Sequence, residues 1–300
     1  MEYLKRLQSG IIRTVQQNTL TLLGVFFAIT ITLGTIALHD ARPPELRVSF
    51  LDIGQGDAIL IEAPNGREIM IDSGRDQSVI EQLGAVKNFF DHTIDFALMT
   101  HSDADHIGGF PYVFDRYHIS TVIKSEISSP TLIDRTVASD ISAEHSDRIL
   151  ARSGERIILD PKHGVVLDIL FPDQNTTGWE TNDASIVAKL SYGDTAFILT
   201  GDSPVNVEQF LVKTYGDQLH ADVLKLGHHG SKTSSSQEFL DAVHPSVAIV
   251  SAGLGNKYGH PNPEVVDRVE ASGIQILETS RSGRITCDSD GVKVSCIGEK

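Results

Sequence analysis

The sequence contains little cysteine and little positive charge. Its two cysteines, Cys287 and Cys296, lie away from the histidine-rich motifs, so we exclude cysteine as a metal ligand. Asp and Glu outnumber Lys and Arg by 40 to 25, which gives a formal net charge of −15. Because nucleic-acid binding depends largely on neutralising phosphates, this charge argues against a surface devoted to nucleic acid. Five cations towards the C-terminus could still form a local basic patch: Lys225, Lys232, Lys257, Arg281 and Arg284.

The two cysteines flank a typical hairpin-turn sequence, residues 288–291. With Asp290-Gly291 as a two-residue turn, Cys287 is expected opposite Val294. Cys296 then lies one diagonal step away. A disulfide is compatible with this register, although the two cysteines are not direct cross-strand partners in it.

A charge-free run near the N-terminus, residues 19–38, predicts a transmembrane anchor. The run is long enough to span a bilayer core of ~30 Å. Basic residues precede it, so residues 1–18 are expected in the cytoplasm and the rest of the chain outside it. A cleaved signal peptide is the alternative. We disfavour it because its apolar core usually has only ~7–15 residues and ends at a cleavage site that is not found here. Residues 39–46, with Pro43-Pro44, would form a short stiff linker to a domain over residues 47–300.

Residues 47–300 alternate strands with helices and contain no internal repeat. Asn65-Gly66 marks a hairpin turn between the second and third strands. The pattern fits two packed sheets flanked by helices, an α/β fold. Helices are expected at residues 78–90 and 205–215, with a helical and loop-rich stretch over 110–165. Strands are expected at residues 46–51, 58–62, 68–71, 96–99, 121–124, 165–171, 186–192, 196–199, 223–226 and 247–251, before the C-terminal hairpin.

The most informative motif is His101-Ser102-Asp103-Ala104-Asp105-His106. It follows the apolar run Phe96–Met99 and precedes Gly108-Gly109. This order is typical of a buried strand that ends in a tight loop and opens a helix, where several side chains can face one point. A solvated charged loop is the alternative, but such loops seldom mix His and Asp in this way. The motif therefore predicts a metal site.

Further potential ligands also come after apolar runs. Asp72, Asp202 and the pair His228-His229 each follow one. In α/β folds, the carboxyl ends of strands are where sites are built. Each residue alone would be an ordinary strand-ending turn residue. Together they indicate a metal centre.

With these motifs in this order, the chain resembles the metallo-β-lactamase superfamily, whose signature is His-x-His/Asp-x-Asp-His followed by a later Asp and a later His. Within it, the chain resembles the hydrolase domain of ComEC-type competence proteins. The resemblance covers residues 47–297. It implies an αββα sandwich, preceded here by the transmembrane anchor, with the site along one edge of the sheets. The matching stretches are residues 50–58, 101–109, 182–185, 199–202, 225–232 and 258–261.

The resemblance implies two divalent metal ions, Zn²⁺ or Mn²⁺. Such a pair lowers the pKa of a shared water and holds the attacking and leaving oxygens of a displacement. Asp105 is expected to take part in catalysis as well as in metal binding, and His229 is the alternative to His228. The implied ligands are His101 and Asp103 for the first ion, Asp105, His106 and His228 for the second, and Asp202 as the bridge.

Other residues of the matching stretches are expected to support the ligands or to contact substrate. Asp72 would orient a ligand histidine, and Asp57 would either do the same or cap a Gly-rich turn. Lys232 would bind a phosphate oxygen, and His260 would protonate a leaving group or hold phosphate. The remaining members of this supporting set are Asn182, Lys225, His229 and Ser231.

The sequence departs from the wider superfamily at two ligand positions. Asp103 stands where a histidine is commoner, and Asn182-Asp183 stands where another histidine is usual. Oxygen ligands shift the preference towards Mn²⁺, so both Mn²⁺ and Zn²⁺ stay open. Three histidines in the same interval lie in polar contexts and are not expected to bind metal: His118, His145 and His163.

The resemblance implies a membrane-anchored hydrolase of phosphodiesters, with single-stranded DNA as an expected substrate. ComEC-type proteins also carry a channel domain of several helices, so a role in DNA uptake would need a channel partner here. The alternative is the hydrolysis of small extracytoplasmic esters, such as phosphorylcholine-type diesters or lactones, which suits the acidic composition. A binding module without activity is disfavoured because the main ligands are present.

Overall fold

The computed structural model describes residues 19, 21, 23–32 and 45–300. The chain divides into two compact units, Met1–Pro44 and Glu45–Lys300. In the first unit the described residues are helical. No helix in the described part of the chain combines the length and the apolar character needed to cross a membrane. The expected cytoplasmic tail, most of the linker and residues 20, 22 and 33–38 of the expected anchor lie outside the described residues.

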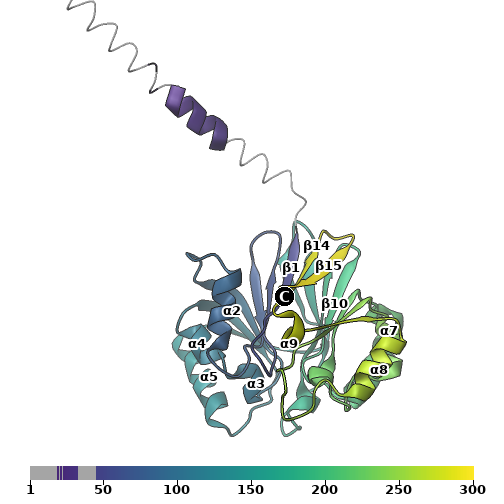
Figure 1. The fold of residues 1–300 in the computed structure, drawn as a ribbon. Coiled ribbons are helices and arrows are strands. Elements are labelled where there is room, and N and C mark those ends of the chain that lie inside the picture. The colour runs from purple at the N-terminus through teal and green to yellow at the C-terminus, as the bar shows by residue number, and fades with distance from the viewer. Residues whose placement is uncertain (1–18, 20, 22, 33–44) are drawn as a thin grey trace, which may run out of the picture. The chain divides into compact units, whose positions relative to one another are not determined.

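Two mixed sheets form the second unit and pack face to face (Figure 1). The first sheet has the strand order β15-β14-β1-β2-β3-β4-β5-β6, and the second β13-β12-β11-β10-β9-β8-β7. The first comprises β1 (Leu46–Phe50), β2 (Ile59–Glu62), β3 (Glu68–Ile71), β4 (Thr93–Met99), β5 (His118–Lys124), β6 (Asp147–Leu150), β14 (Ile285–Ser289) and β15 (Val294–Gly298). The second comprises β7 (Arg156–Asp160), β8 (Val165–Phe171), β9 (Val187–Tyr192), β10 (Thr195–Leu199), β11 (Val223–Lys225), β12 (Val247–Val250) and β13 (Gln275–Glu278).

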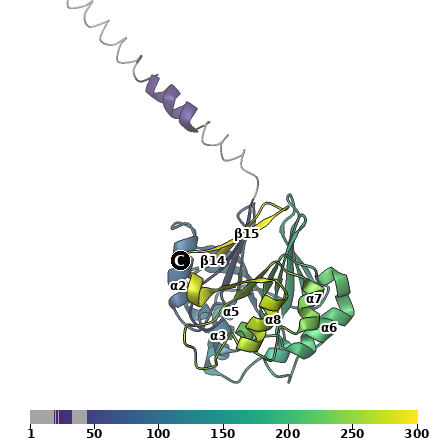
Figure 2. The ribbon, with the colours of Figure 1, turned by 45° about the vertical axis from the view of Figure 1, so that its right-hand side comes forward.

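Helices cover the outer faces of both sheets, which confirms the expected αββα layering (Figures 1 and 2). A central core fills the space between the sheets, and an outer core lies under each helical layer. The first layer contains α2 (Ser78–Val86), α4 (Phe110–Phe114) and α5 (Leu132–Ala143), and the second α6 (Val205–Tyr215), α7 (Gln237–Val243) and α8 (Pro263–Ala271). Two four-residue helices, α3 (Ala104–Ile107) and α9 (Thr279–Ser282), complete the described helices of α type in this unit.

Each sheet contains a block of parallel strands, and these blocks position the polar motifs. Strands β3 and β4 are parallel neighbours in the first sheet, and β10 and β11 are parallel neighbours in the second. The residues that follow each pair therefore emerge at one edge of their sheet. The motifs predicted to bind metal come from these strand ends.

Most expected elements agree with the structure, and the differences have local causes. The helix expected over residues 78–90 ends at Val86, because Lys87 takes an extended backbone (ψ 153°) and turns inward to pair with Glu68. The stretch 110–165, expected to be helical and loop-rich, also contains β6 and β7. Strand β6 has no fully buried residue, so it lacks the alternation of apolar residues that reveals a strand in the sequence.

The C-terminal hairpin corrects the expected register. Cys287 lies directly opposite Cys296, and the two form a disulfide with Cα atoms 4.0 Å apart. The turn is longer than two residues because Ser289 pairs with Val294. The Asp290 carboxylate stabilises this longer turn by accepting hydrogen bonds from the backbone N–H groups of residues 292 and 293.

Reduction of this disulfide should lower the free energy of unfolding by about 2 kcal/mol, because the cross-link restricts the unfolded chain. Urea unfolding with and without dithiothreitol measures the loss. A double Cys287→Ala/Cys296→Ala variant should show the same loss and no response to the reductant. A wild-type midpoint that does not move on reduction would contradict this expectation.

Candidate metal centre

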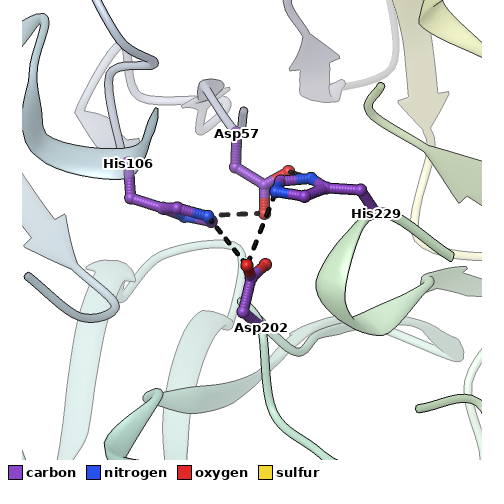
Figure 3. A group of neighbouring side chains, drawn as sticks. All are labelled: Asp57, His106, Asp202 and His229. Atoms are coloured by element: carbon purple, nitrogen blue, oxygen red, sulfur yellow. Dashed lines mark ion pairs between the residues drawn. The ribbon is translucent and has the colours of Figure 1, made fainter. Parts of the chain in front are cut away.

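The centre gathers side chains from the ends of both sheets. His101 follows β4, and His106 lies in α3 directly after it. Asp202 follows β10, and His229 lies in η3 (Gly227–Gly230) after β11. Asp57 reaches the same point from the loop before β2 (Figure 3). The two sheets thus each supply part of one cluster.

Asp202 lies at the middle of the cluster. Four imidazole Nε2 atoms converge on its Oδ2 oxygen, at 3.3 Å for His106, 3.5 Å for His229, 3.8 Å for His228 and 4.0 Å for His101. Two further carboxylates contact imidazoles of the cluster. Asp103 Oδ2 lies 3.7 Å from the Nε2 of His101, and Asp105 Oδ2 lies 3.7 Å from the Nε2 of His229. One oxygen of Asp202 therefore faces all four imidazoles, with Asp103 beside His101 and Asp105 beside His229.

Each of the four imidazoles has its Nδ1 atom against a neighbouring oxygen, so that Nε2 faces the centre. An outer hydrogen bond of this kind fixes the ring and its tautomer, as in metal-binding histidines. The hydrogen-bond distances are 3.0 Å from His101 Nδ1 to Thr100 Oγ1, 2.7 Å from His106 Nδ1 to Asp72 Oδ2 and 3.3 Å from His228 Nδ1 to Thr233 Oγ1. The Nδ1 of His229 lies 3.4 Å from Asp57 Oδ1, an ion-pair contact without hydrogen-bond geometry.

The inward atoms fit divalent cations. The Nε2 atoms of His101, His106 and His229 and the Oδ1 of Asp202 are buried and have no hydrogen-bond partner in the described part of the chain. A buried polar atom without a partner costs about 1–3 kcal/mol, which a bound cation would recover. Asp57, His106, Asp202 and His229 each offer a ligand atom, all within 4.8 Å of one another. Nitrogen and carboxylate oxygen donors are those of Zn²⁺ and Mn²⁺ sites.

The electrostatics keep Asp202 ionised. Burial alone would raise its pKa, but His106 and His229 beside it hold the pKa well below its usual range. Burial likewise opposes the charge of His106, yet the carboxylates of Asp202 and Asp72 raise the pKa of its imidazole well above normal. Burial and the charge of His106 lower the pKa of His101. The charges around the centre thus shift the pKa values of His106 and His101 in opposite directions.

Lys225 and Asp57 form a buried ion pair next to this cluster. The Lys225 ammonium lies 2.5 Å from Asp57 Oδ2 and donates a hydrogen bond of 3.2 Å to the carbonyl of Gly201. Neither side chain is more than 2% exposed. Burial opposes ionisation of Asp57, but Lys225 and then His229 lower its pKa to about 2. Lys225 therefore joins the loop of Asp57 to the turn that carries Asp202.

Gly56 allows the loop of Asp57 to approach the metal motif closely. Its φ is +128°, and a Cβ atom there would lie 2.1 Å from the carbonyl oxygen of Asp105. The same carbonyl accepts a 3.2 Å hydrogen bond from the N–H of Asp57. Any side chain at position 56 would push these two loops apart.

Gly56→Ala should therefore lower the metal content and destabilise the fold by about 2 kcal/mol or more, because the new atom clashes with backbone. Gly54→Ala is the matched control. Gly54 also has a positive φ (+76°), but nothing lies within 4 Å of its Cβ position. Metal content and urea unfolding of the two variants should thus distinguish the effect of the clash from that of the positive φ, which both positions share. Equal effects of the two substitutions would contradict this role of Gly56.

The backbone is strained where the centre is built. Asp72, His228 and His229 have φ values of 55°, 47° and 55°, in the left-handed region that residues other than glycine rarely adopt. Such strain costs roughly 1–3 kcal/mol per residue and is found mainly at functional sites. Here it turns two adjacent histidines towards the same carboxylate.

The structure places His229, rather than His228, beside Asp105 and His106. His228 remains near Asp202, but its side chain is 28% exposed, whereas that of His229 is 2% exposed. Asp57 lies inside the cluster, where it orients His229 and meets Lys225.

The other predicted residues lie around the centre. Asn182 lies in η1 (Asn182–Ala184) with its Oδ1 buried and without a partner in the described part of the chain. The hydroxyl of Ser231 faces that of Thr233 at 3.0 Å. Lys232 is exposed, and its ammonium pairs with no carboxylate of the described residues. The His260 ring lies 5.4 Å from that of His228, and burial, with the charges of His228 and His229, lowers the pKa of His260.

Three histidines not expected to bind metal are outside the cluster. His118 pairs with Glu144, His163 pairs with Asp160, and His145 is exposed. Sequence reasoning did miss two hydroxyls of the centre. The Thr100 hydroxyl donates to Asp72 at 2.6 Å and contacts His101, and the Ser185 hydroxyl accepts from the N–H of Asp202 at 3.2 Å. Their proximity to the motifs was a signal, but Ser and Thr are too common for it to be specific.

This fold and this centre define the class of the protein. The profile of the metallo-beta-lactamase superfamily matches residues 51–253, and the chain belongs to that superfamily. It is related to competence proteins, which confirms the resemblance inferred from the motifs. The chain is 29% identical to ComE operon protein 3 of Bacillus subtilis (strain 168), over 83% of this chain and 34% of that protein. It is 31% identical to Competence protein ComA of Neisseria gonorrhoeae, over 86% and 35%.

The chain spans about a third of the length of these curated relatives. A solved structure with the same fold is Igni18, a metallo hydrolase from the archaeon Ignicoccus hospitalis KIN4/I. It has a TM-score of 0.52 and 18% identity, and the match covers 80% of this chain and 98% of Igni18. This likeness supports the fold.

Proposed function

We propose that this chain is a metal-dependent phosphodiesterase whose substrate is single-stranded nucleic acid, with DNA as the first candidate. One observation carries the proposal: the Nε2 atoms of four histidines lie within 4.0 Å of one oxygen of Asp202, and the carboxylates of Asp103 and Asp105 lie beside two of these histidines. A pair of metal ions held by this set of ligands would stabilise both the attacking and the leaving oxygen of a phosphoryl displacement. The kinship with competence proteins supports a nucleic-acid substrate.

The proposed centre holds two divalent ions, Zn²⁺ or Mn²⁺. His101 and Asp103 would hold the first, and Asp105, His106 and His229 the second, with Asp202 shared. When bound, the ions would lower the pKa of a water molecule and neutralise charge on the phosphate. The chain itself orients the imidazoles through Thr100, Asp72 and Asp57. His260, whose lowered pKa favours the neutral imidazole, would accept a hydrogen bond or a proton at its inward edge.

One observation favours a smaller substrate as the second candidate. Of the five cations that could form a basic patch, Lys225 is buried against Asp57, Arg281 pairs with Glu278 and Arg284 pairs with Glu299. Lys232 and Lys257 alone remain for phosphates among these five. Two cations supply little of the affinity that a long polyanion needs, so a small ester or diester is the alternative.

We further propose that the hydrolase unit lies outside the cytoplasm, held by the apolar segment 19–38. The basic residues before this segment support that orientation. The Cys287–Cys296 disulfide also supports it, because disulfides persist in oxidising compartments. If the protein serves DNA uptake, a channel partner would provide the passage. Protease digestion of intact and permeabilised cells tests the topology: cleavage of the hydrolase unit only after permeabilisation of the inner membrane would overturn it.

The substrate assay uses the full chain in mild detergent, with single-stranded DNA and bis(p-nitrophenyl) phosphate as parallel substrates and Mn²⁺ or Zn²⁺ titrated in. Asp105→Ala should abolish activity, and Asp217→Asn, at an exposed site in η2 (Gly216–Leu219), is the control. Cleavage of both substrates is the expected result. Cleavage of the small diester alone would favour the second candidate, and no cleavage with either metal would reject a phosphodiesterase.

A further inference from the structure

A line of aromatic rings leads from the metal centre to the surface. The ring of His260 lies 5.4 Å from that of His228, measured between centroids. The ring of Tyr258 stacks on that of His260, with centroids 5.8 Å apart and 23° between the ring planes. Tyr258 is 50% exposed. The rings of His228, His260 and Tyr258 therefore follow one another from Asp202 to solvent.

The loop that carries these rings is held by one side chain. The Asn256 carbonyl oxygen accepts hydrogen bonds from the backbone N–H groups of Tyr258 (3.1 Å) and His260 (3.0 Å). Its amide nitrogen donates to the carbonyls of Gly253 (2.9 Å) and His260 (2.5 Å). Four bonds from one residue hold the loop in shape, so Tyr258 does not need to be ordered by a ligand.

A hollow of about 600 Å³ opens along the same loop. His260 lines it, together with Val266 of α8 and Ile276 of β13. The charged groups at its wall are mainly carboxylates, those of Asp267, Glu270 and Glu278, while Arg281 is paired with Glu278 at 3.1 Å. Carboxylates repel phosphate but accept hydrogen bonds from amino groups. The hollow thus suits the uncharged, amino-bearing part of a ligand.

A cation stands next to the exposed ring. The Lys257 ammonium lies 5.0 Å from the centroid of the Tyr258 ring and pairs with no carboxylate of the described residues. An aromatic ring beside a free ammonium is the combination that single-stranded nucleic-acid sites use, in which the ring stacks a base and the cation meets the adjoining phosphate. Lys257 is free to turn from the ring to such a phosphate.

We infer that Tyr258 is a stacking platform for a nucleobase of a single-stranded substrate, with Lys257 as the contact for its phosphate. The inference rests on the proposed function and gives that substrate a second point of attachment beside the metal centre. It also explains how an acidic protein can hold a polyanion: stacking supplies affinity that does not depend on positive charge.

The test measures binding without turnover, by fluorescence anisotropy of the full chain in EDTA. The probes are a short oligodeoxycytidylate, its ribonucleotide counterpart and an abasic strand of the same length. Wild type should bind the base-bearing strands more tightly than the abasic one. Tyr258→Ala should weaken binding of the base-bearing strands by roughly 5- to 150-fold, the range of base–aromatic stacking, and leave abasic binding unchanged.

Three further variants make the result specific. Tyr258→Phe should bind like wild type, because stacking does not need the hydroxyl. Lys257→Ala should weaken all three strands by the same factor. Tyr112→Ala is the matched control, since Tyr112 is a 43% exposed tyrosine on α4 that does not line this hollow.

Equal affinity of wild type for base-bearing and abasic strands, or no effect of Tyr258→Ala, would overturn the platform, as would a failure to bind any strand. A failure of the proposed function has a different signature, namely normal binding with no cleavage when Mn²⁺ or Zn²⁺ is supplied. Preference for the deoxyribose or the ribose strand will identify which nucleic acid the platform serves.

Discussion

Asp202→Asn is expected to remove most of the bound metal and to lower hydrolysis by on the order of 100-fold or more. Loss of an outer hydrogen-bond partner of a metal ligand already costs about 10–100-fold. Asp202 is closer to the centre than such a partner, because its Oδ2 lies within 4.0 Å of the ligand nitrogens of His101, His106 and His229. The amide has the same shape but no charge, so it cannot balance the charge of a bound cation. Metal per protein, measured by elemental analysis after dialysis, and turnover of bis(p-nitrophenyl) phosphate provide the two readouts.

The matched variant for this experiment is Ser185→Ala. It removes the hydroxyl that accepts from the N–H of Asp202 but leaves the carboxylate, so a smaller loss is expected. Far-UV circular dichroism of the metal-free variants shows whether they fold. An Asp202→Asn protein that is folded and still holds the wild-type amount of metal would contradict the central position of Asp202.

Lys225→Met should destabilise the fold by about 3–5 kcal/mol. The methionine fills nearly the same space but leaves the Asp57 carboxylate buried without its counter-charge, and the removal of one partner from a buried ion pair has this cost. The carbonyl of Gly201 would also lose its donor. Urea unfolding in EDTA gives the free energy without any contribution from metal binding.

A second substitution separates the charge from the packing. Asp57→Asn in the Lys225→Met background removes the uncompensated charge, so the double variant should recover most of the lost stability. It should nevertheless bind metal less well than wild type, since an amide orients His229 less strongly than a carboxylate. A single Lys225→Met variant within 1 kcal/mol of wild type would show that Asp57 does not depend on this cation.

The sequence alone could predict the layers of the fold and the strand ends that carry the ligands. Apolar runs followed by His and Asp, as at Asp72 and His101, reveal both the strand and the edge at which it ends. The choice between His228 and His229 could not be predicted, because both take a left-handed backbone and only the path of the chain after β11 decides which ring turns inward.

Two other features depended on contacts that no local pattern encodes. Asp57 joins the cluster because Lys225 meets it from the other sheet, 168 positions further along the chain. The partner of Cys287 depended on the length of one turn, which a carboxylate at Asp290 extends. In each case, contacts of one charged side chain settled the arrangement.

The ligands come from both sheets, so a metal ion at the centre would cross-link them. His101 and His106 follow β4 of the first sheet, and Asp202 and His229 follow β10 and β11 of the second. A bound cation would therefore join the two sheets at one end of the central core. Opening of that end and release of the cation would be the same event. Removal of the metal by a chelator should then loosen the packing between the two sheets first, while the outer helices stay packed on their own sheets.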